Sequence, residues 1–460
     1  MTELRRATKS LDTVRRAREM LGSYYKRAER RREGAPLAWC MAGVPSELLQ
    51  AFDLSCEWPE NFGTLCASRG VAAELCERAE GEGYSQDLCS YVRNSIGYVS
   101  RLLELGQVPP EAPRGGLGTA TMLLGSGALC DPRIKWFQSL SSQYLPLPVF
   151  HIDPMSPPHD SHVDDPRIEA HYKEILSETL HEQVAFLERT LGRPMDTERL
   201  RAALGNAQEM IALLWEIQSL RRAVPCPMGS EDFFTGGVVP LLFMLGERDA
   251  VEYFRCLRDE VRDRVARGVG VIPDERFRLL WMGIPPWYNL GFFNSLGELG
   301  AVFPAETSYY VGAPVEIDLS DPLEALVDRT WKRAVWITRW GAEVIPENLS
   351  PSGFSQPGTR LIRQWVHDYR LDGAVMHRTR SCRAVSWGQI HIKNQLEEEG
   401  IPSLIFESDM ADPRSWADTI IMGQIQGFLE AIAAGRRERA RASLAPRPVS
   451  ASPGWTWAPP

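Results

Sequence analysis

The chain has 460 residues, of which 44% are hydrophobic and 24% are charged, and its formal net charge at pH 7 is −9. That length exceeds what one hydrophobic core usually supports, so we expect two or three globular units. No apolar run approaches the roughly 20 residues of a membrane helix, and the N-terminal segment lacks the apolar core and cleavage site of a secretory signal. We therefore expect a cytoplasmic protein without a membrane span.

The nine cysteines lie in a chain that has no export signal, which indicates reduced thiols or metal ligands rather than a disulfide framework. No CxxC pair occurs, so the sequence has neither a zinc ribbon nor a ferredoxin-type run of cluster ligands. The phosphate-binding motif GxxxxGK[ST] is also absent. The sequence therefore has no nucleotide-binding loop of this type.

The N-terminal segment is basic, with eleven Lys and Arg against five Asp and Glu in residues 1–33. Its apolar residues recur at helical spacing: Leu11, Val14, Met20, Leu21 and Tyr24. This pattern predicts an amphipathic helix that packs on the rest of the chain and keeps a solvated basic face. We favour this reading over a nucleic-acid or lipid contact, because acidic residues are interleaved with the basic ones.

The remainder of the chain alternates short apolar runs with amphipathic helical stretches, as parallel sheets flanked by helices do. In the first unit we expect strands at 121–124 and 147–152 and long helices at 167–192 and 197–223. In the second unit we expect strands at 277–282, 374–377 and 403–406 and helices at 385–398 and 415–434. The predicted fold is α/β, with two Rossmann- or flavodoxin-like parallel-sheet lobes, an N-terminal helical arm and long helices between the lobes.

The predicted organisation has four parts. Residues 1–34 form the helical arm, 35–225 the first lobe, 226–436 the second lobe and 437–460 a disordered tail rich in Ser, Pro and Ala. The boundary between the lobes rests on the segment Cys226-Pro227-Met228-Gly229, which interrupts the helical pattern.

Three cysteines stand out because each lies at a predicted helix start. Cys89 lies in the first turn of a helix, and Cys130 and Cys382 each follow a predicted strand and precede a helix. Unpaired amides and the dipole at a helix N-terminus favour thiolate over thiol and stabilise the negative charge of an iron-sulfur cluster. The alternative is that these cysteines are small core residues, and their spacing does not decide between the two.

The contexts of the three cysteines resemble those of the benzoyl-CoA reductase/2-hydroxyacyl-CoA dehydratase family. These contexts are YSQDLCSYVR at residues 84–93, Cys130 with Lys135-Trp136-Phe137, and Ser381-Cys382 followed by Gly388-Gln389. Two further segments, VPSELL at 44–49 and ESDMADPR at 407–414, are similar to an early and a late motif of the family. The resemblance extends over roughly residues 35–435, and DAVEY at 249–253 is similar to the larger cluster-bearing subunit of benzoyl-CoA reductases.

The resemblance implies a cofactor and partners. The cofactor is a 4Fe-4S cluster held by the thiolates of Cys89, Cys130 and Cys382, which leaves one iron open to a ligand that is not a thiolate. The implied partners are a homologous second subunit, which makes a heterodimer, and a separate iron-sulfur activator that hydrolyses ATP and injects the electron. The substrate is an acyl-CoA thioester.

The resemblance leaves the reaction type open between two enzymes. We favour dearomatising reduction of a benzoyl-CoA type substrate, because the segments around residues 89, 135 and 249 are most similar to the reductase subunit. The alternative is 2-hydroxyacyl-CoA dehydration, in which a ketyl radical at the thioester carbonyl lets the α-hydroxyl leave. Two further possibilities are a subunit that only relays electrons or serves as a scaffold, and a homodimeric reductase that acts alone.

Several other side chains are candidates for the site. Glu60 and Glu47 are the acid or base candidates, and Glu47 can instead be a first-turn carboxylate that interacts with backbone amides. Trp281, Trp287 and Tyr288 are candidates for the wall of an acyl pocket, with core packing as the alternative. Cys40, near the early motif, is a candidate for contact with substrate. The His- and Asp-rich segment 151–165 reads as a loop rather than a divalent-metal site.

Overall fold

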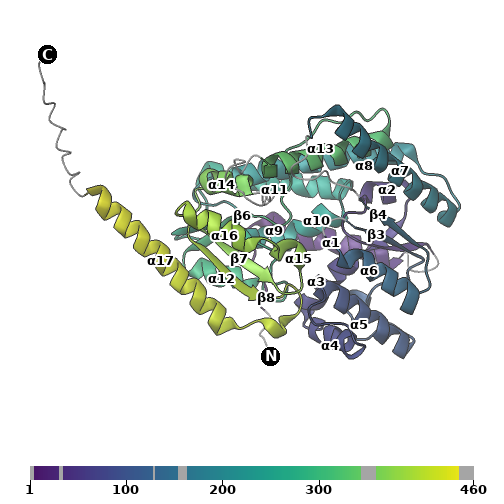
Figure 1. Cartoon of the computed structure of the whole chain (residues 1–460), viewed down its shortest axis with the longest axis horizontal. Coiled ribbons are helices and arrows are strands. Elements are labelled where there is room, and N and C mark those ends of the chain that lie inside the picture. Colours follow the sequence, from purple (N-terminus) through teal and green to yellow (C-terminus); the bar gives the residue numbers. More distant parts are fainter. Residues whose placement is uncertain (1–4, 31–34, 128–129, 154–162, 343–358, 445–460) are drawn as a thin grey trace, which may run out of the picture.

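A computed structural model describes residues 5–30, 35–127, 130–153, 163–342 and 359–444 (Figure 1). Two four-stranded parallel sheets form its centre. The strands of the first sheet lie in the order β2-β1-β3-β4, and those of the second in the order β6-β5-β7-β8. In each sheet the second strand along the chain lies at one edge, next to the first, and the third and fourth strands follow on the other side. Because both sheets have this order, the lobes are structural duplicates, and the predicted two-lobed α/β fold is confirmed.

The first sheet consists of β1 (Leu37–Cys40), β2 (Ser55–Glu57), β3 (Met122–Ser126) and β4 (Val149–Ile152). The second consists of β5 (Phe277–Met282), β6 (Ala301–Glu306), β7 (Gly373–Thr379) and β8 (Ser403–Ser408). The central strands are buried along nearly their whole length, as expected for parallel sheets with helices on both faces.

The first lobe contains α2 (Ser46–Ala51), α3 (Pro59–Arg69), α4 (Ala72–Gly81), α5 (Ser90–Leu105) and α6 (Pro132–Ser139). The second lobe contains α12 (Gly291–Glu298), α14 (Thr359–Asp368), α15 (Arg383–Ser386), α16 (Gln389–Glu398) and α17 (Asp418–Leu444). Short segments η1 (Pro113–Gly115), η2 (Leu140–Tyr144) and η3 (Pro413–Ser415) complete these units. Figure 1 shows α17 running away from the body toward the C-terminus.

The remaining helices are five long ones, α1 (Asp12–Arg30), α7 (Pro166–Leu191), α8 (Thr197–Leu220), α11 (Arg248–Arg267) and α13 (Pro322–Ala342), and two short ones, α9 (Ser230–Gly236) and α10 (Val238–Phe243). Asp196 caps α8, as predicted, by accepting a hydrogen bond from the Arg199 amide at 3.0 Å. The apolar face of α1 is buried against α9 and α11, with Leu11, Val14 and Ala17 fully inaccessible. The N-terminal segment is therefore a docked helix whose apolar face faces the protein.

The five predicted strands correspond within a few residues to β3, β4, β5, β7 and β8, whereas β1, β2 and β6 were not predicted. The predicted long helices at 167–192 and 197–223 correspond to α7 and α8 within three residues at each end. The second lobe differs at one helix, which is interrupted at Gly388 and forms α15 and α16 in place of one element over 385–398. The C-terminal helix continues to Leu444, so it extends into the segment predicted as a tail, and residues 445–460 lie outside the described residues. In the described part of the chain, none of the helices has the length and apolarity of a membrane span.

Candidate active site

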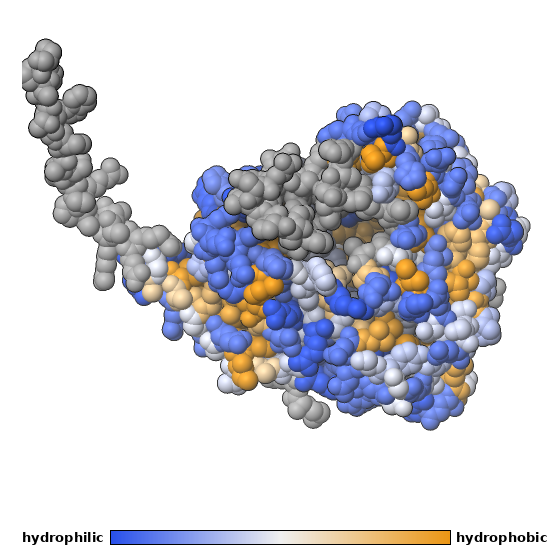
Figure 2. Space-filling view, in the orientation of Figure 1, coloured by the Kyte–Doolittle hydropathy of each residue, from blue (hydrophilic) through white to orange (hydrophobic). Residues whose placement is uncertain are grey.

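A cavity of about 990 Å³ opens between the two lobes. Figure 2 shows that the face toward the viewer is hollowed between them. The residues that follow the carboxyl ends of strands line the cavity: Glu60 after β2, Cys130 after β3, Trp287 after β5, Tyr309 after β6 and Cys382 after β7. Open α/β sheets bind ligands at this edge, and here two such edges face one space large enough for a small-molecule ligand.

The three predicted cluster cysteines line this same cavity. Cys89 and Cys382 are the N-cap residues of α5 and α15, and Cys130 lies two residues before α6. Cys89 and Cys130 come from the first lobe and Cys382 from the second, yet their thiols are close enough for the charge of each to act on the others. The site is therefore complete only when both lobes are in place.

Backbone amides of the following helical turns reach each thiol. Val92 and Tyr91 donate toward Cys89, Arg133 toward Cys130, and Val385 and Ala384 toward Cys382. Burial nevertheless raises the pKa of all three thiols, that of Cys382 to about 11, and their mutual repulsion adds to the increase for Cys89 and Cys382. The thiols are protonated in the free chain at neutral pH, and a positively charged group bound between them would release those protons.

Glu60 lies in the cavity wall and is held by two contacts. Its Oε2 accepts a hydrogen bond from the Ala42 amide at 2.6 Å, and its Oε1 pairs with the guanidinium of Arg133. Arg133 also donates to the Ala42 carbonyl at 2.6 Å. The charge of Arg133 acts on the thiols of both Cys130 and Cys89. The Glu60–Arg133 pair thus places a positive charge close to Cys89 and Cys130, and the carboxylate of Glu60 is paired with that charge.

A hydrogen-bonded link joins the lobes beside the cysteines. The Ser90 amide, next to Cys89, donates to Ser381 Oγ at 3.1 Å. Ser381, next to Cys382, donates through the same hydroxyl to the buried carboxylate of Asp409. The other oxygen of Asp409 accepts from the Ala411 and Asp412 amides at 3.0 and 3.1 Å. This link fixes the distance between the residues that carry two of the thiols.

A second interlobe contact lies close to the first. The side chain of Arg93, in the first turn of α5, is 2% exposed and pairs with Asp412 at 3.0 Å and Glu80 at 2.5 Å. Arg414 pairs with both of these carboxylates. Because each charge in this network has a partner of opposite sign, the network stabilises the lobe contact rather than burying an isolated charge.

We expect Ser381→Ala to weaken the lobe contact. The substitution removes a donor to a buried carboxylate and an acceptor for the Ser90 amide, which typically costs about 1–3 kcal/mol of unfolding free energy. Urea unfolding followed by tryptophan fluorescence measures this loss. Ser219→Ala is the control, because the hydroxyl of Ser219 bonds to the Trp215 carbonyl of its own helix. Equal unfolding midpoints for the two variants would contradict the role of the link.

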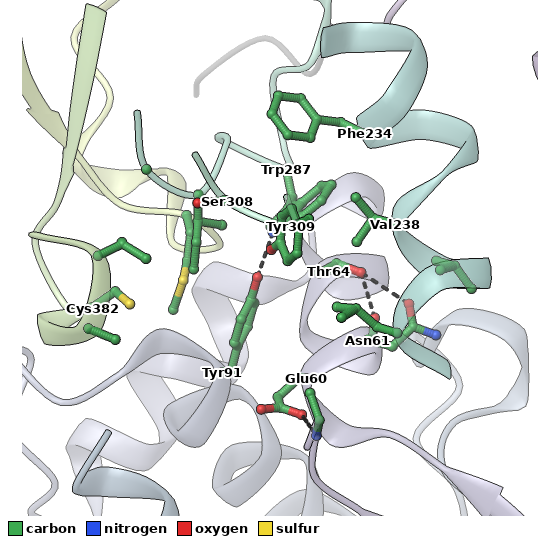
Figure 3. A pocket seen from close by; sticks show the side chains of 18 of the residues that line it. Glu60, Asn61, Thr64, Tyr91, Phe234, Val238, Trp287, Ser308, Tyr309 and Cys382 are labelled. Carbon is green, nitrogen blue, oxygen red and sulfur yellow. Dashed lines mark hydrogen bonds between the residues drawn. The ribbon is translucent and has the colours of Figure 1, made fainter. Parts of the chain in front are cut away.

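Aromatic side chains form the opposite wall of the cavity, as Figure 3 shows. The Trp287 indole donates to the Tyr91 hydroxyl at 2.5 Å, and the Tyr309 hydroxyl lies close to that of Tyr91. Burial raises the pKa of both tyrosines, so both hydroxyls remain protonated donors. The ring of Phe234 lies 6.2 Å from that of Trp287 and 6.4 Å from that of Tyr309. The wall is apolar except for two hydroxyls.

The structure brings some of the predicted site residues together and separates others. Trp287 and Tyr288 line the cavity with Glu60 and the three cysteines. Trp281 does not line it, because it is fully buried in the second lobe and packs on Phe293 and Phe303. Core packing, the alternative reading, therefore describes Trp281.

Cys40 and Glu47 also lie outside the cavity lining. Cys40 is fully buried on β1 beside the thiol of Cys56, and burial raises its pKa. Glu47 is fully buried in the first turn of α2 and pairs with Arg329 at 2.5 Å. Both side chains contact neighbouring elements and do not line the cavity that contains Cys89, Cys130 and Cys382.

Four residues of the site were not identified from the sequence. Tyr91, Arg133 and Ser381 lie within three residues of Cys89, Cys130 and Cys382, respectively. Their position next to a cysteine at a predicted helix start could have identified them as site residues. Tyr309 had no such signal, because it follows β6, a strand that the apolar pattern did not reveal. Of the His- and Asp-rich segment, residues 154–162 lie outside the described residues.

No set of three His, Cys, Asp or Glu side chains in the described ranges is arranged to hold a metal ion. A 4Fe-4S cluster is much larger than one ion, and its ligand sulfurs stand correspondingly further apart. The thiols of Cys89, Cys130 and Cys382 line one shared cavity.

Comparison with known proteins gives a family match over most of the chain. The model of the family described as 2-hydroxyglutaryl-CoA dehydratase, D-component, matches residues 41–432. The chain is 27% identical over 421 residues to the (R)-2-hydroxyisocaproyl-CoA dehydratase alpha subunit of Clostridioides difficile, covering 90% of this chain and 94% of that protein. It is 26% identical over 449 residues to a benzoyl-CoA reductase subunit of Thauera aromatica, covering 93% and 95%. It is 22% identical to the (R)-2-hydroxyglutaryl-CoA dehydratase alpha subunit of Acidaminococcus fermentans, covering 93% and 98%.

Proposed function

Because the chain belongs to the 2-hydroxyglutaryl-CoA dehydratase D-component family, we propose that it is the iron-sulfur subunit of a low-potential, one-electron enzyme that acts on acyl-CoA thioesters. The family resemblance inferred from the cysteine contexts is confirmed, and the relatives are subunits of 2-hydroxyacyl-CoA dehydratases and of benzoyl-CoA reductase. The observation that carries the proposal is the meeting of three helix-start thiols from both lobes in one cavity.

The donor set fits a 4Fe-4S cluster held by Cys89, Cys130 and Cys382. Three thiols are present, each within reach of amides from a helix start, and such amides stabilise the negative charge of a thiolate-ligated cluster. Arg133 adds a positive charge beside two of them. When bound, such a cluster supplies a single low-potential electron and has one iron without a protein thiolate.

The residues around the thiols suit an acyl thioester. Phe234, Val238 and Trp287 offer an apolar wall that packs against the acyl group and keeps water away from a radical. Glu60 offers a carboxylate for proton transfer beside the reacting group, and its pairing with Arg133 fixes its orientation. Trp387, next to Gly388, lines the cavity and is 78% exposed.

For the reaction, we favour dearomatising reduction of an aryl-CoA. The support is the likeness to a benzoyl-CoA reductase subunit over 93% of the chain and the aromatic wall, which suits a flat ring. The second candidate is dehydration of a 2-hydroxyacyl-CoA, and the relatives that are dehydratase alpha subunits favour it. Both reactions use the same thioester position and the same thiols.

The proposed assembly has two partners. Each of these relatives is named as one subunit of its enzyme, which favours a second subunit for this chain as well. The electron would come from a separate iron-sulfur activator that hydrolyses ATP, since the sequence has no phosphate-binding loop of its own. An electron-relay role, with substrate held only by the partner, predicts that substrate leaves the spectrum of this chain's cluster unchanged.

The test is electron-dependent turnover of two substrates under exclusion of oxygen. The chain is combined with its second subunit and activator, and benzoyl-CoA and 2-hydroxyisocaproyl-CoA are assayed separately with and without ATP. We expect ATP-dependent loss of the aromatic absorbance of benzoyl-CoA. Turnover of 2-hydroxyisocaproyl-CoA alone would reverse the order of the two candidates, and turnover of neither would contradict the proposed function.

A further inference from the structure

Tyr309 has a backbone conformation that tyrosine rarely adopts. Its φ of 70° lies in the left-handed region, where a side chain with a β-carbon is strained. It is the third residue after β6, on the loop that leaves the second sheet at the cavity. Strain of this kind persists where the surrounding structure holds a residue, and it concentrates at sites where a side chain must be aimed.

The side chain of Tyr309 is aimed into the cavity and held on two sides. Its ring lies 6.4 Å from that of Phe234 and 6.2 Å from that of Trp287. Its hydroxyl lies close to that of Tyr91, whose own hydroxyl accepts from the Trp287 indole at 2.5 Å. Figure 3 shows Tyr91 rising from its helix toward Tyr309 and Trp287, with Cys382 farther to the left.

The position of Tyr91 is itself fixed by a glycine. A β-carbon at Gly63 would lie 2.7 Å from a ring carbon of Tyr91, so α3 can approach the ring only because residue 63 has no side chain. The Tyr309 hydroxyl is therefore positioned before any ligand enters. Preorganised donors of this kind are effective because they need no reorientation when charge develops.

The groups around the Tyr309 hydroxyl define where it lies. It is close enough to Cys382, and to Glu60 with its partner Arg133, for the charge of each to act on it. The hydroxyl thus shares the cavity with the three thiols and with Glu60, the only carboxylate that this chain's described residues contribute to the cavity lining. An acyl thioester bound beside the thiols would have its reacting carbonyl in this space.

We propose that Tyr309 is a catalytic residue whose hydroxyl donates a hydrogen bond to the carbonyl oxygen of the acyl thioester, and that Tyr91 positions it. This inference rests on the proposed function. When one electron from the low-potential donor enters the thioester, no bond breaks, and the added negative charge collects on the carbonyl oxygen. A donor fixed at that oxygen stabilises the charged state more than the neutral substrate.

The test is Tyr309→Phe in the complete complex with second subunit and activator. With the substrate that the wild type converts, benzoyl-CoA or 2-hydroxyisocaproyl-CoA, we expect kcat to fall by about 10²–10³, the effect of removing one donor to a developing oxyanion. KM should change little, because the contact strengthens only as charge develops. Iron and sulfide content should equal that of the wild type. Tyr91→Phe should lower kcat by a smaller factor, because it acts through Tyr309.

Tyr172→Phe is the matched control, since it removes a hydroxyl on α7, where the ring stacks on Trp331 outside the cavity lining. Tyr309→Phe with the kcat of Tyr172→Phe would overturn the inference and leave the proposed function intact. Loss of iron in Tyr309→Phe would also overturn it, because the residue would then act on the site and not on substrate. A wild-type complex that converts neither substrate would overturn the proposed function, and the inference with it.

Discussion

Replacing Cys382 by serine should abolish iron binding by the anaerobically purified chain. The wild type should carry roughly four irons and as many sulfides, the content of one 4Fe-4S cluster. Serine is similar in size to cysteine but is a poor ligand for this group, so the cluster loses the one thiolate that comes from the second lobe. Chemical iron and sulfide analysis and EPR of the reduced protein measure the change. Cys89→Ser and Cys130→Ser should behave in the same way.

A cysteine variant outside the site and a measurement of secondary structure serve as controls for this prediction. Cys256→Ser changes an exposed cysteine on α11 and should retain full iron content. Far-UV circular dichroism of Cys382→Ser should match the wild type, because Cys382 sits at a helix cap and its hydrogen bonds are with backbone amides. If the wild type bound no iron, or if Cys382→Ser bound as much as the wild type, the three cysteines would not be cluster ligands.

Five strands of the described residues were predicted from the sequence, namely β3, β4, β5, β7 and β8, and β1, β2 and β6 were missed. The run at 277–282 is β5 itself, because a strand buried on both faces needs few polar interruptions. Two of the strands that were missed, β2 and β6, lie at sheet edges. The first has three residues, and the second contains Pro304, which an edge strand tolerates and which argues against a strand in any sequence pattern.

The site was predictable where function depends on local chain geometry. A cysteine before a helix is visible in the sequence, and the structure brings three of them into one cavity. Contacts that depend on strand order are not visible in this way. Ser381 meets Asp409 because β7 and β8 are neighbours with Thr379 opposite Ser408, and that pairing was unknown beforehand. Tyr309 was hidden for a related reason, since its strand was not recognised.

Glu60→Gln should lower turnover by about 10²–10⁴, the usual contribution of a positioned acid or base. Because the substitution also leaves Arg133 buried without its carboxylate, we expect the free energy of unfolding to fall by about 3–5 kcal/mol. The two losses have different causes, and a single variant does not separate them. Turnover per bound iron and urea unfolding must therefore be measured on the same preparation.

The double variant Glu60→Gln/Arg133→Met separates catalysis from stability. Replacing both members of a buried ion pair removes the charge that Glu60→Gln leaves without its carboxylate, so most of the unfolding free energy should return. Turnover should stay low, since the carboxylate is still absent. The reduction potential of the cluster should become more negative than in Glu60→Gln. The positive charge of Arg133 acts on Cys130 and Cys89 and favours electron uptake by a cluster bound to them, and the double variant lacks this charge. Recovery of turnover together with stability would mean that Glu60 only holds Arg133 in place and takes no part in proton transfer.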